Sequence, residues 1–163
     1  MNRLKKRVDL KHASGEKMLS VFLTAGYPER DSTMPLVESI SEAGADFIEL
    51  GMPFSDPMAD GPTIQASSQR ALQNGMTVAH LLKQVTDLRR RTQIPIVLMG
   101  YLNPLLKYGL TNFVKDAEHA GADGFIIPDL IPENTTATAA LLSRLLSGSI
   151  FSFHLIHLRN GFE

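Results

Sequence analysis

The sequence contains no cysteine and no tryptophan, and its 163 residues carry a formal net charge of -1. Without cysteine it can form no disulfide, so nothing indicates an oxidising compartment and a cytoplasmic protein is expected. A net charge near zero provides no basic surface for nucleic acid. No apolar run approaches the roughly 18 residues needed to span a bilayer. These absences exclude nucleic-acid-binding and membrane-spanning classes and leave one ordinary globular domain.

The amino terminus, residues 2–8, is basic but lacks the apolar core of a signal peptide. We expect a short surface helix there, with Leu4 and Val8 turned inward. Apolar residues at helical spacing predict further helices at about 32–43, 62–72, 77–88, from 111, and at 134–147. Asp31 or Ser32 is expected to cap the first of these helices, which carries Leu36, Val37 and Ile40 on one face, and Gly44 is expected to end it.

Five short apolar runs predict strands between these helices, at residues 18–23, 47–50, 94–100, 124–127 and 150–153. Most successive strands start roughly 30 residues apart, which is the size of a βαβ unit. The sequence Ala-Gly-Ala-Asp occurs at 43–46 and again at 120–123, as a repeated helix-to-strand turn. The pattern predicts an α/β domain, either an open parallel sheet or part of a (β/α)₈ barrel. No Gly-x-Gly-x-x-Gly follows the first strand, which argues against dinucleotide binding.

The stretch from Phe47 to Pro62 holds the candidate site. Glu49 lies within an apolar run that predicts a strand buried on both faces. A carboxyl group away from water holds its proton more tightly, as a proton shuttle near neutral pH requires. The following loop carries Asp56 and Asp60. The alternative is that Glu49 faces water on an edge strand and that the aspartates only form turns.

Four blocks of sequence resemble the α subunit of tryptophan synthase. The first is Glu-Leu-Gly-Met-Pro-Phe-Ser-Asp-Pro-Met-Ala-Asp-Gly-Pro-Thr-Ile-Gln at 49–65. The others are Phe-Leu-Thr-Ala-Gly-Tyr-Pro at 22–28, Met-Gly-Tyr-Leu-Asn-Pro at 99–104 with Tyr108-Gly109, and Gly-Ala-Asp-Gly at 121–124 with Pro-Asp-Leu at 128–130. The resemblance extends from about Arg3 to Thr138. It implies the first four to five βα units of a (β/α)₈ TIM barrel.

The resemblance also implies a lyase that acts in tryptophan biosynthesis. The family cleaves indole-3-glycerol phosphate to indole and glyceraldehyde 3-phosphate, and its partner is a β subunit that holds pyridoxal phosphate. By resemblance, Glu49 is the acid/base and Asp60 binds the indole N–H. Phe22, Ile64 and Tyr101 are expected to line the substrate pocket. The residues expected to face the β subunit are Pro53, Asp56, Pro57, Asn103, Pro104 and Asp129. No cofactor or metal is expected in this chain.

The resemblance fades after about residue 139. We therefore expect residues 1–139 to form the amino-terminal half of a barrel and 140–163 to be a divergent tail, in a family member that is truncated or frameshifted. His154 and His157 in this tail are too few ligands to predict a metal site. Such a chain is predicted to be inactive alone. Two alternatives are a non-catalytic remnant that binds a β subunit and a different barrel enzyme that acts on sugar phosphates.

Overall fold

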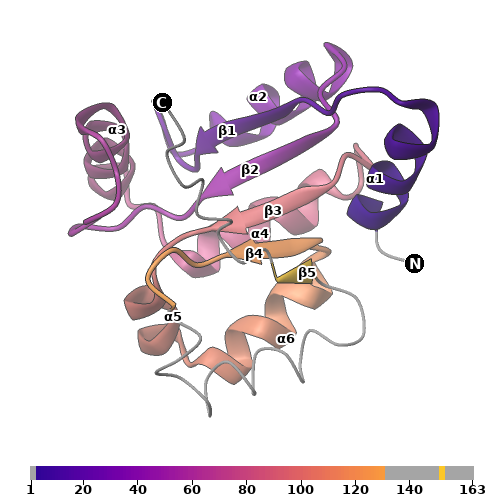
Figure 1. Cartoon of the computed structure of the whole chain (residues 1–163). Coiled ribbons are helices and arrows are strands. Elements are labelled where there is room, and N and C mark those ends of the chain that lie inside the picture. The colour runs from indigo at the N-terminus through magenta and orange to yellow at the C-terminus, as the bar shows by residue number, and fades with distance from the viewer. Residues whose placement is uncertain (1–2, 131–150, 153–163) are drawn as a thin grey trace, which may run out of the picture.

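The computed structural model describes residues 3–130 and 151–152, which form a parallel sheet with helices around it (Figure 1). The strands lie in the order β1-β2-β3-β4-β5. Their bounds are β1 Ser20–Thr24, β2 Phe47–Gly51, β3 Ile96–Met99, β4 Gly124–Ile126 and β5 Phe151–Ser152. The helices are α1 Arg3–Ser14, α2 Thr33–Glu42, α3 Pro62–Gln73, α4 Val78–Leu88, α5 Leu102–Tyr108 and α6 Leu110–Ala120.

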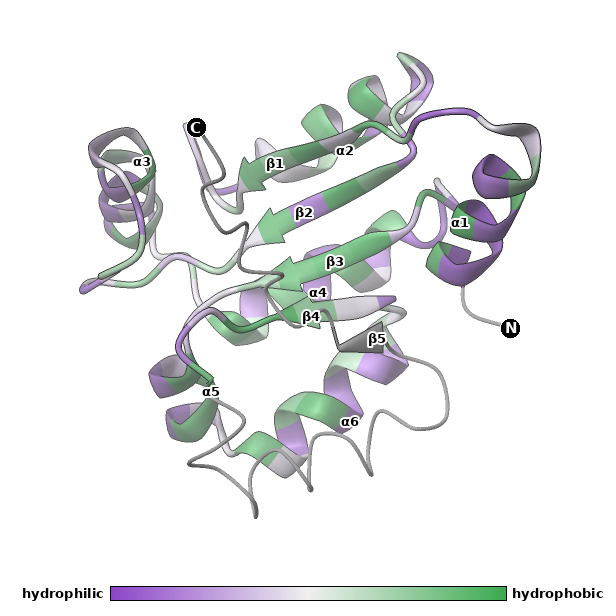
Figure 2. Cartoon of the chain, in the orientation of Figure 1, coloured by the Kyte–Doolittle hydropathy of each residue, from purple (hydrophilic) through white to green (hydrophobic). Residues whose placement is uncertain are grey.

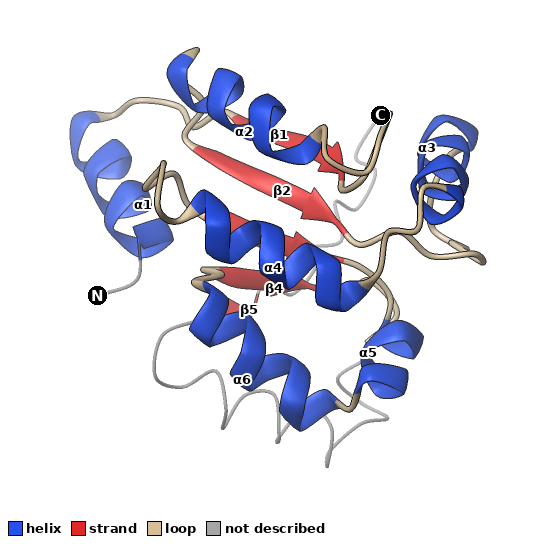
Figure 3. Cartoon of the chain, turned by 180° about the vertical axis from the view of Figure 1, so that it is seen from behind, coloured by secondary structure: helices blue, strands red, loops and turns tan. Residues whose placement is uncertain are grey.

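Helices α2, α4 and α6 cover one face of the sheet (Figure 3). The strands are mainly hydrophobic, whereas α1 is mainly hydrophilic (Figure 2). In register, Ile48 lies beside Ile96, and Leu98 lies between Leu50 and Phe125, each at most 3% exposed. These side chains share a core with residues of the covering helices, including Val37, Leu81, Val85, Phe113 and Val114. The core therefore lies between this face and the helices.

The strand order decides between the two predicted architectures. Each strand pairs in parallel with the strand before it, from β1 to β5. A doubly wound sheet reverses its strand order at a switch point and carries helices on both faces. A (β/α)₈ barrel keeps its strands in sequential order and its helices on the outside. The sheet is therefore an arc of a barrel, and its other face corresponds to the barrel interior.

Most elements lie where the sequence predicted them. Gly44 has a φ of +96° after α2, and Thr77 begins α4 by accepting a hydrogen bond from the backbone N–H of His80 at 3.2 Å. The predicted burial of Val8 is wrong, because it is 37% exposed, and helix α1 buries only Leu4. On the predicted apolar face of α2, Val37 is buried and Ile40 packs against the core, but Leu36 is 36% exposed. The helix predicted from 134 lies outside the described residues.

Helix α5 was not predicted, and its first turn explains why. Its third residue is Pro104, which resembles a turn signal but is tolerated where helix N–H groups have no partner within the helix. The backbone N–H of Leu102 instead donates to both oxygens of Asp129, at 2.9 and 3.1 Å.

Ser32 precedes α2 as predicted, but its side chain makes no capping bond. None of the helices in the described ranges combines the length and apolar character that a bilayer crossing needs.

The repeated Ala-Gly-Ala-Asp turn has one structural role in both copies. The carboxylate of Asp46 accepts the backbone N–H of Leu19 at 2.8 Å, and that of Asp123 accepts the N–H of Ile96 at 3.0 Å. The backbone N–H groups of the two aspartates donate to the carbonyls of the same residues, at 2.9 and 2.8 Å. Each aspartate therefore fastens the start of its strand to the preceding strand in the sheet.

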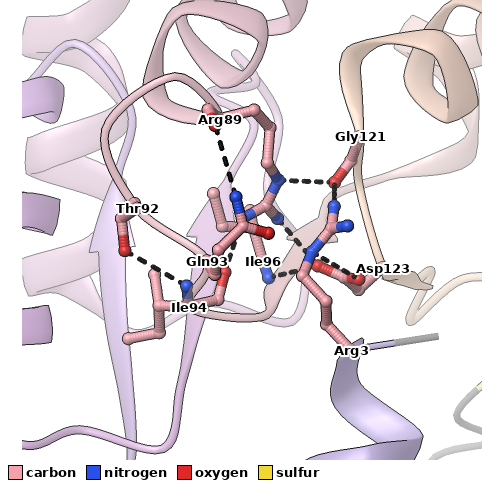
Figure 4. A network of polar contacts seen from close by, with 8 residues as sticks. All are labelled: Arg3, Arg89, Thr92, Gln93, Ile94, Ile96, Gly121 and Asp123. Carbon is pink, nitrogen blue, oxygen red and sulfur yellow. Dashed lines mark hydrogen bonds and ion pairs between the residues drawn. The ribbon is translucent and has the colours of Figure 1, made fainter.

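The basic side chains of α1 dock on these two aspartates. Arg3 lies 3.2 Å from the Asp123 carboxylate, and Lys11 lies 3.5 Å from that of Asp46. Figure 4 shows that Arg89 from the end of α4 joins the first group, where it donates to the Asp123 carboxylate at 2.7 Å and to the carbonyl of Gly121 at 2.8 Å. Burial lowers the pKa of Arg89 to about 10. The basic amino terminus is thus a structural clamp at the amino end of the sheet.

Candidate active site

A small pocket lies at the carboxyl ends of β1, β2 and β3. It contains four of the five residues predicted to act on a substrate, Phe22, Asp60, Ile64 and Tyr101. They come from β1, from the loop before α3, from α3 itself and from the start of α5. The remaining lining residues are Thr24, Gly51, Met52, Ser68, Met99, Gly100 and Pro128. The carboxyl edge of a barrel sheet is where polar side chains from several loops meet.

Two glycines make close contacts possible at the pocket floor. A Cβ atom at Gly51 would lie 2.6 Å from the ring of Phe22, and one at Gly100 would lie 2.7 Å from the Met52 side chain. The pocket encloses about 20 Å³, which is room for one water molecule. A larger ligand would therefore enter only if side chains such as Phe22 and Met52 move apart.

Glu49 lies on the face of the sheet opposite to α2, α4 and α6, one layer below this pocket. In register it stands between Phe22 of β1 and Val97 of β3. It is not a lining residue, but Gly51, which points to the same face two positions later, does line the pocket. Glu49 is half-buried rather than fully buried as predicted. Helices α2, α4 and α6 lie against the opposite face of the sheet (Figure 3).

Tyr101 connects the Asp60 loop to β3. Its hydroxyl oxygen accepts the backbone N–H of Ala59 at 2.9 Å. Burial raises the pKa of the Tyr101 phenol above its ordinary value, and the negative charge of the nearby Asp60 carboxylate raises it further. The ring packs against that of Phe54 at 5.5 Å between centroids. The aspartate is thus held beside a neutral phenol.

Sequence reasoning missed a hydroxyl pair behind the pocket. The side chains of Thr24 and Ser67 lie 2.7 Å apart, and Ser67 also donates to the carbonyl of Ile64 at 2.9 Å. Two signals could have pointed to this region. Thr24 ends a strand at the carboxyl edge, and Ser68, another lining residue, follows Ile64 by four positions and so shares its face of α3.

A wider groove lies outside this pocket and collects four of the six predicted partner-facing residues. They are Pro53, Asp56, Asn103 and Pro104. Its volume is about 610 Å³, and its other walls are Phe54, Ser55, Leu72, Met76, Thr77, Val78, Ala79, Lys107 and Tyr108. The groove is therefore mainly apolar, with a few charged side chains.

The other two predicted partner-facing residues are placed differently. Pro57 is buried, so its side chain is not available to a partner. Asp129 is exposed, but its carboxylate accepts the backbone N–H of Leu102 at the start of α5. Within residues 3–130 and 151–152, no three His, Cys, Asp or Glu side chains are grouped so as to hold a metal ion. His154 and His157 lie outside the described residues.

Fold and site together define a class of protein. The sheet is parallel, its strands lie in sequential order, and helices cover its outer face. Carboxylates lie on its inner face and at its carboxyl edge. This arrangement is that of a (β/α)₈-barrel protein. A sequence model of the family described as Tryptophan synthase alpha chain matches residues 9–146. The chain belongs to the tryptophan synthase alpha chain family.

Individual relatives agree with this assignment. The chain is 52% identical over 136 residues to the tryptophan synthase alpha chain of Geobacter sulfurreducens, covering 83% of this chain and 51% of that protein. It spans about half the length of the curated relatives that it matches. The crystal structure of tryptophan synthase subunit alpha from Legionella pneumophila str. Paris superposes with a TM-score of 0.87 at 40% identity, covering 93% of this chain and 57% of that one.

A further solved structure is that of tryptophan synthase from M. tuberculosis in its aminoacrylate-bound form. The TM-score is 0.83 at 33% identity, and the match covers 93% of this chain and 60% of that one. Both solved neighbours therefore continue beyond the part that this chain matches. The predicted fold class, a partial (β/α)₈ barrel, is confirmed by this likeness.

Proposed function

We propose that this chain carries the acid/base half of a carbon–carbon lyase site that cleaves indole-3-glycerol phosphate to indole and glyceraldehyde 3-phosphate. The observation that supports this most is the single pocket that contains Phe22, Asp60, Ile64 and Tyr101, with Glu49 one layer below it. Membership of the tryptophan synthase alpha chain family supports the choice of substrate.

In the proposed reaction, Glu49 and Asp60 have separate tasks. The protonated Glu49 carboxyl group first gives its proton to the ring carbon. The resulting carboxylate then takes the proton of the glycerol hydroxyl next to the ring, so that the carbon–carbon bond breaks as an aldehyde forms. Protonation of the ring leaves positive charge on the indole nitrogen. The Asp60 carboxylate accepts the indole N–H and stabilises that charge. The aromatic ring of Phe22 and the side chain of Ile64 supply apolar contact once the pocket widens.

The sequence predicted a chain that is inactive alone; we propose that residues 1–163 retain only slow turnover by themselves. The resembled family binds the substrate phosphate through backbone N–H groups that follow later strands, and this chain spans about half the length of the curated relatives that it matches. Each hydrogen bond to a charged group contributes roughly 1.5 to 3 kcal/mol. Three or four missing donors correspond to a loss of turnover of at least about a thousandfold relative to a full-length relative.

The function is tested by incubating the purified chain with indole-3-glycerol phosphate and following indole by fluorescence. The chain has no tryptophan, so the protein contributes little background. We expect Asp60→Asn to reduce the rate of indole release at least tenfold, because the amide cannot neutralise the cationic ring. Asp31→Asn is the matched control, since Asp31 is 81% exposed in its side chain and lies on another loop. Equal rates in all three proteins would contradict the proposed role of Asp60.

A second candidate function is docking on a tryptophan synthase β subunit, the partner that would hold pyridoxal phosphate. The exposed groove lined by Pro53, Asp56, Asn103 and Pro104 favours it. In a pull-down with a purified β subunit, we expect Asp56→Lys to reduce the retained fraction several-fold, whereas Asp31→Lys leaves it unchanged. Retention that is insensitive to both changes would place the contact elsewhere. Docking without any indole release would support the non-catalytic alternative.

A further inference from the structure

The Tyr101 hydroxyl is a meeting point of three segments. Tyr101 directly precedes α5, and only 7% of the residue is exposed. Its oxygen accepts the backbone N–H of Ala59 at 2.9 Å. The Asp60 carboxylate lies close enough to the hydroxyl to raise the pKa of the phenol, and both residues line the same pocket. A phenol carries one proton to donate and lone pairs to accept. It can therefore accept from Ala59 and donate to Asp60 at the same time.

The phenol is itself held in place from two sides. The ring of Phe54 packs against it at a tilt of 35°. Directly after Tyr101, the backbone N–H of Leu102 donates to the carboxylate of Asp129 from the end of β4. Ring and backbone are thus both fixed, so the hydroxyl cannot move far without breaking contacts with other elements.

Two hydrogen bonds hold the backbone of Asp60. The Asp60 N–H donates to the carbonyl of Pro57 at 3.2 Å, and the Asp60 carbonyl accepts from the Gln65 side chain at 2.9 Å. The Tyr101 phenol lies near this carboxylate and has a proton to donate to it. A catalytic group displaced by about 1 Å can lose roughly a hundredfold in rate.

We propose that Tyr101 is a positioning residue, whose hydroxyl fixes both the backbone before Asp60 and the Asp60 carboxylate in the orientation that meets a ligand N–H. This inference rests on the function proposed for Asp60. It assigns to the Tyr101 hydroxyl a task separate from the pocket-lining contact of its ring. The tests below therefore remove the hydroxyl and keep the ring.

The first test measures hydrogen exchange at the Ala59 amide in Tyr101→Phe. Loss of one neutral hydrogen bond is expected to accelerate exchange of this amide about fivefold to tenfold. Tyr27→Phe is the matched control, because it deletes a hydroxyl from a tyrosine that is 44% exposed on the loop after β1. An unchanged Ala59 exchange rate in Tyr101→Phe would overturn the proposal.

The second test separates a bond to Asp60 from general packing. The chain has three tyrosines, so the double variant Tyr27→Phe, Tyr108→Phe leaves Tyr101 as the sole phenol for titration by ultraviolet absorbance. Adding Asp60→Asn is expected to lower the pKa of Tyr101, because the anionic carboxylate no longer favours the neutral phenol. A pKa that does not move would show that the hydroxyl does not contact the carboxylate and would overturn the proposal.

The third test is indole release by the chain. Tyr101→Phe is expected to lower kcat about tenfold with KM changed less than twofold, since the ring still lines the pocket. If the unmodified chain releases no indole, the proposed function fails, while exchange and titration still decide the positioning role. If it releases indole and Tyr101→Phe keeps the full kcat, the proposed function stands and the positioning role fails.

Discussion

Glu49→Gln is expected to lower the rate of indole release by roughly 10² to 10⁴-fold, the range typical of a lost general acid or base. Glutamine keeps the size and polarity of the side chain on β2 but can neither accept nor return a proton. The register between Phe22 and Val97 should be retained, because both neighbouring strands pair through their backbones. The measurement is indole fluorescence at saturating substrate, since the defect is predicted in kcat rather than in binding.

The control for this prediction is Glu38→Gln. Glu38 lies on α2, where its carboxylate pairs with Arg91 at 3.0 Å, away from the pocket. Its replacement should leave the rate unchanged within twofold. A rate for Glu49→Gln within threefold of the unmodified chain would contradict the acid/base assignment, and an equal loss in both variants would indicate a general effect on folding.

Asp123→Ala is expected to reduce the free energy of unfolding by about 3–5 kcal/mol, because it leaves the Arg89 guanidinium without its carboxylate in a largely buried site. The side chain of Asp123 is 3% exposed and that of Arg89 is 12% exposed. The change also removes the acceptor for the backbone N–H of Ile96 (Figure 4). The loss is a large fraction of the roughly 5–15 kcal/mol that a domain possesses. Urea unfolding followed by circular dichroism measures it.

Two further variants make this prediction specific. Asp123→Asn removes the charge and keeps an oxygen that can accept from Ile96, so its effect should be smaller than that of alanine. Asp9→Asn breaks the exposed pair with Lys5, whose atoms lie 2.8 Å apart, and should change stability by less than about 1 kcal/mol. Similar losses for Asp9→Asn and Asp123→Ala would contradict the buried clamp.

Local sequence patterns predicted the strands well, because a strand buried in a parallel sheet appears in the sequence as a short run of apolar residues. Ile48, Leu50, Ile96 and Leu98 are apolar in the sequence and fully buried in the structure. Helix α5 left no comparable signal, since it is short, contains Pro104 and obtains its cap from Asp129, 27 positions after Leu102. A contact over such a distance is invisible to any local pattern.

The candidate site was also predicted only in part from the sequence. The motifs that resemble the tryptophan synthase alpha chain family identified Phe22, Asp60, Ile64 and Tyr101, and the structure gathers these residues in one pocket. Their roles in catalysis stay predictions. The expected full burial of Glu49 was wrong, because a run of apolar residues does not say which face of a strand the helices cover. The sequence also contained no sign that the Tyr101 hydroxyl would meet Ala59, 42 positions earlier.

The sequence by itself determined the alternation of strands and helices, the glycine turns and the presence of acids at the ends of strands, because each depends on residues near one another in the chain. Only the tertiary structure decided that the sheet curves as part of a barrel, that α1 clamps Asp46 and Asp123, and that Tyr101 holds the Asp60 loop. The physical reason is that strand order, docking and hydrogen bonds across the sheet arise from packing between distant segments, which local propensity does not encode.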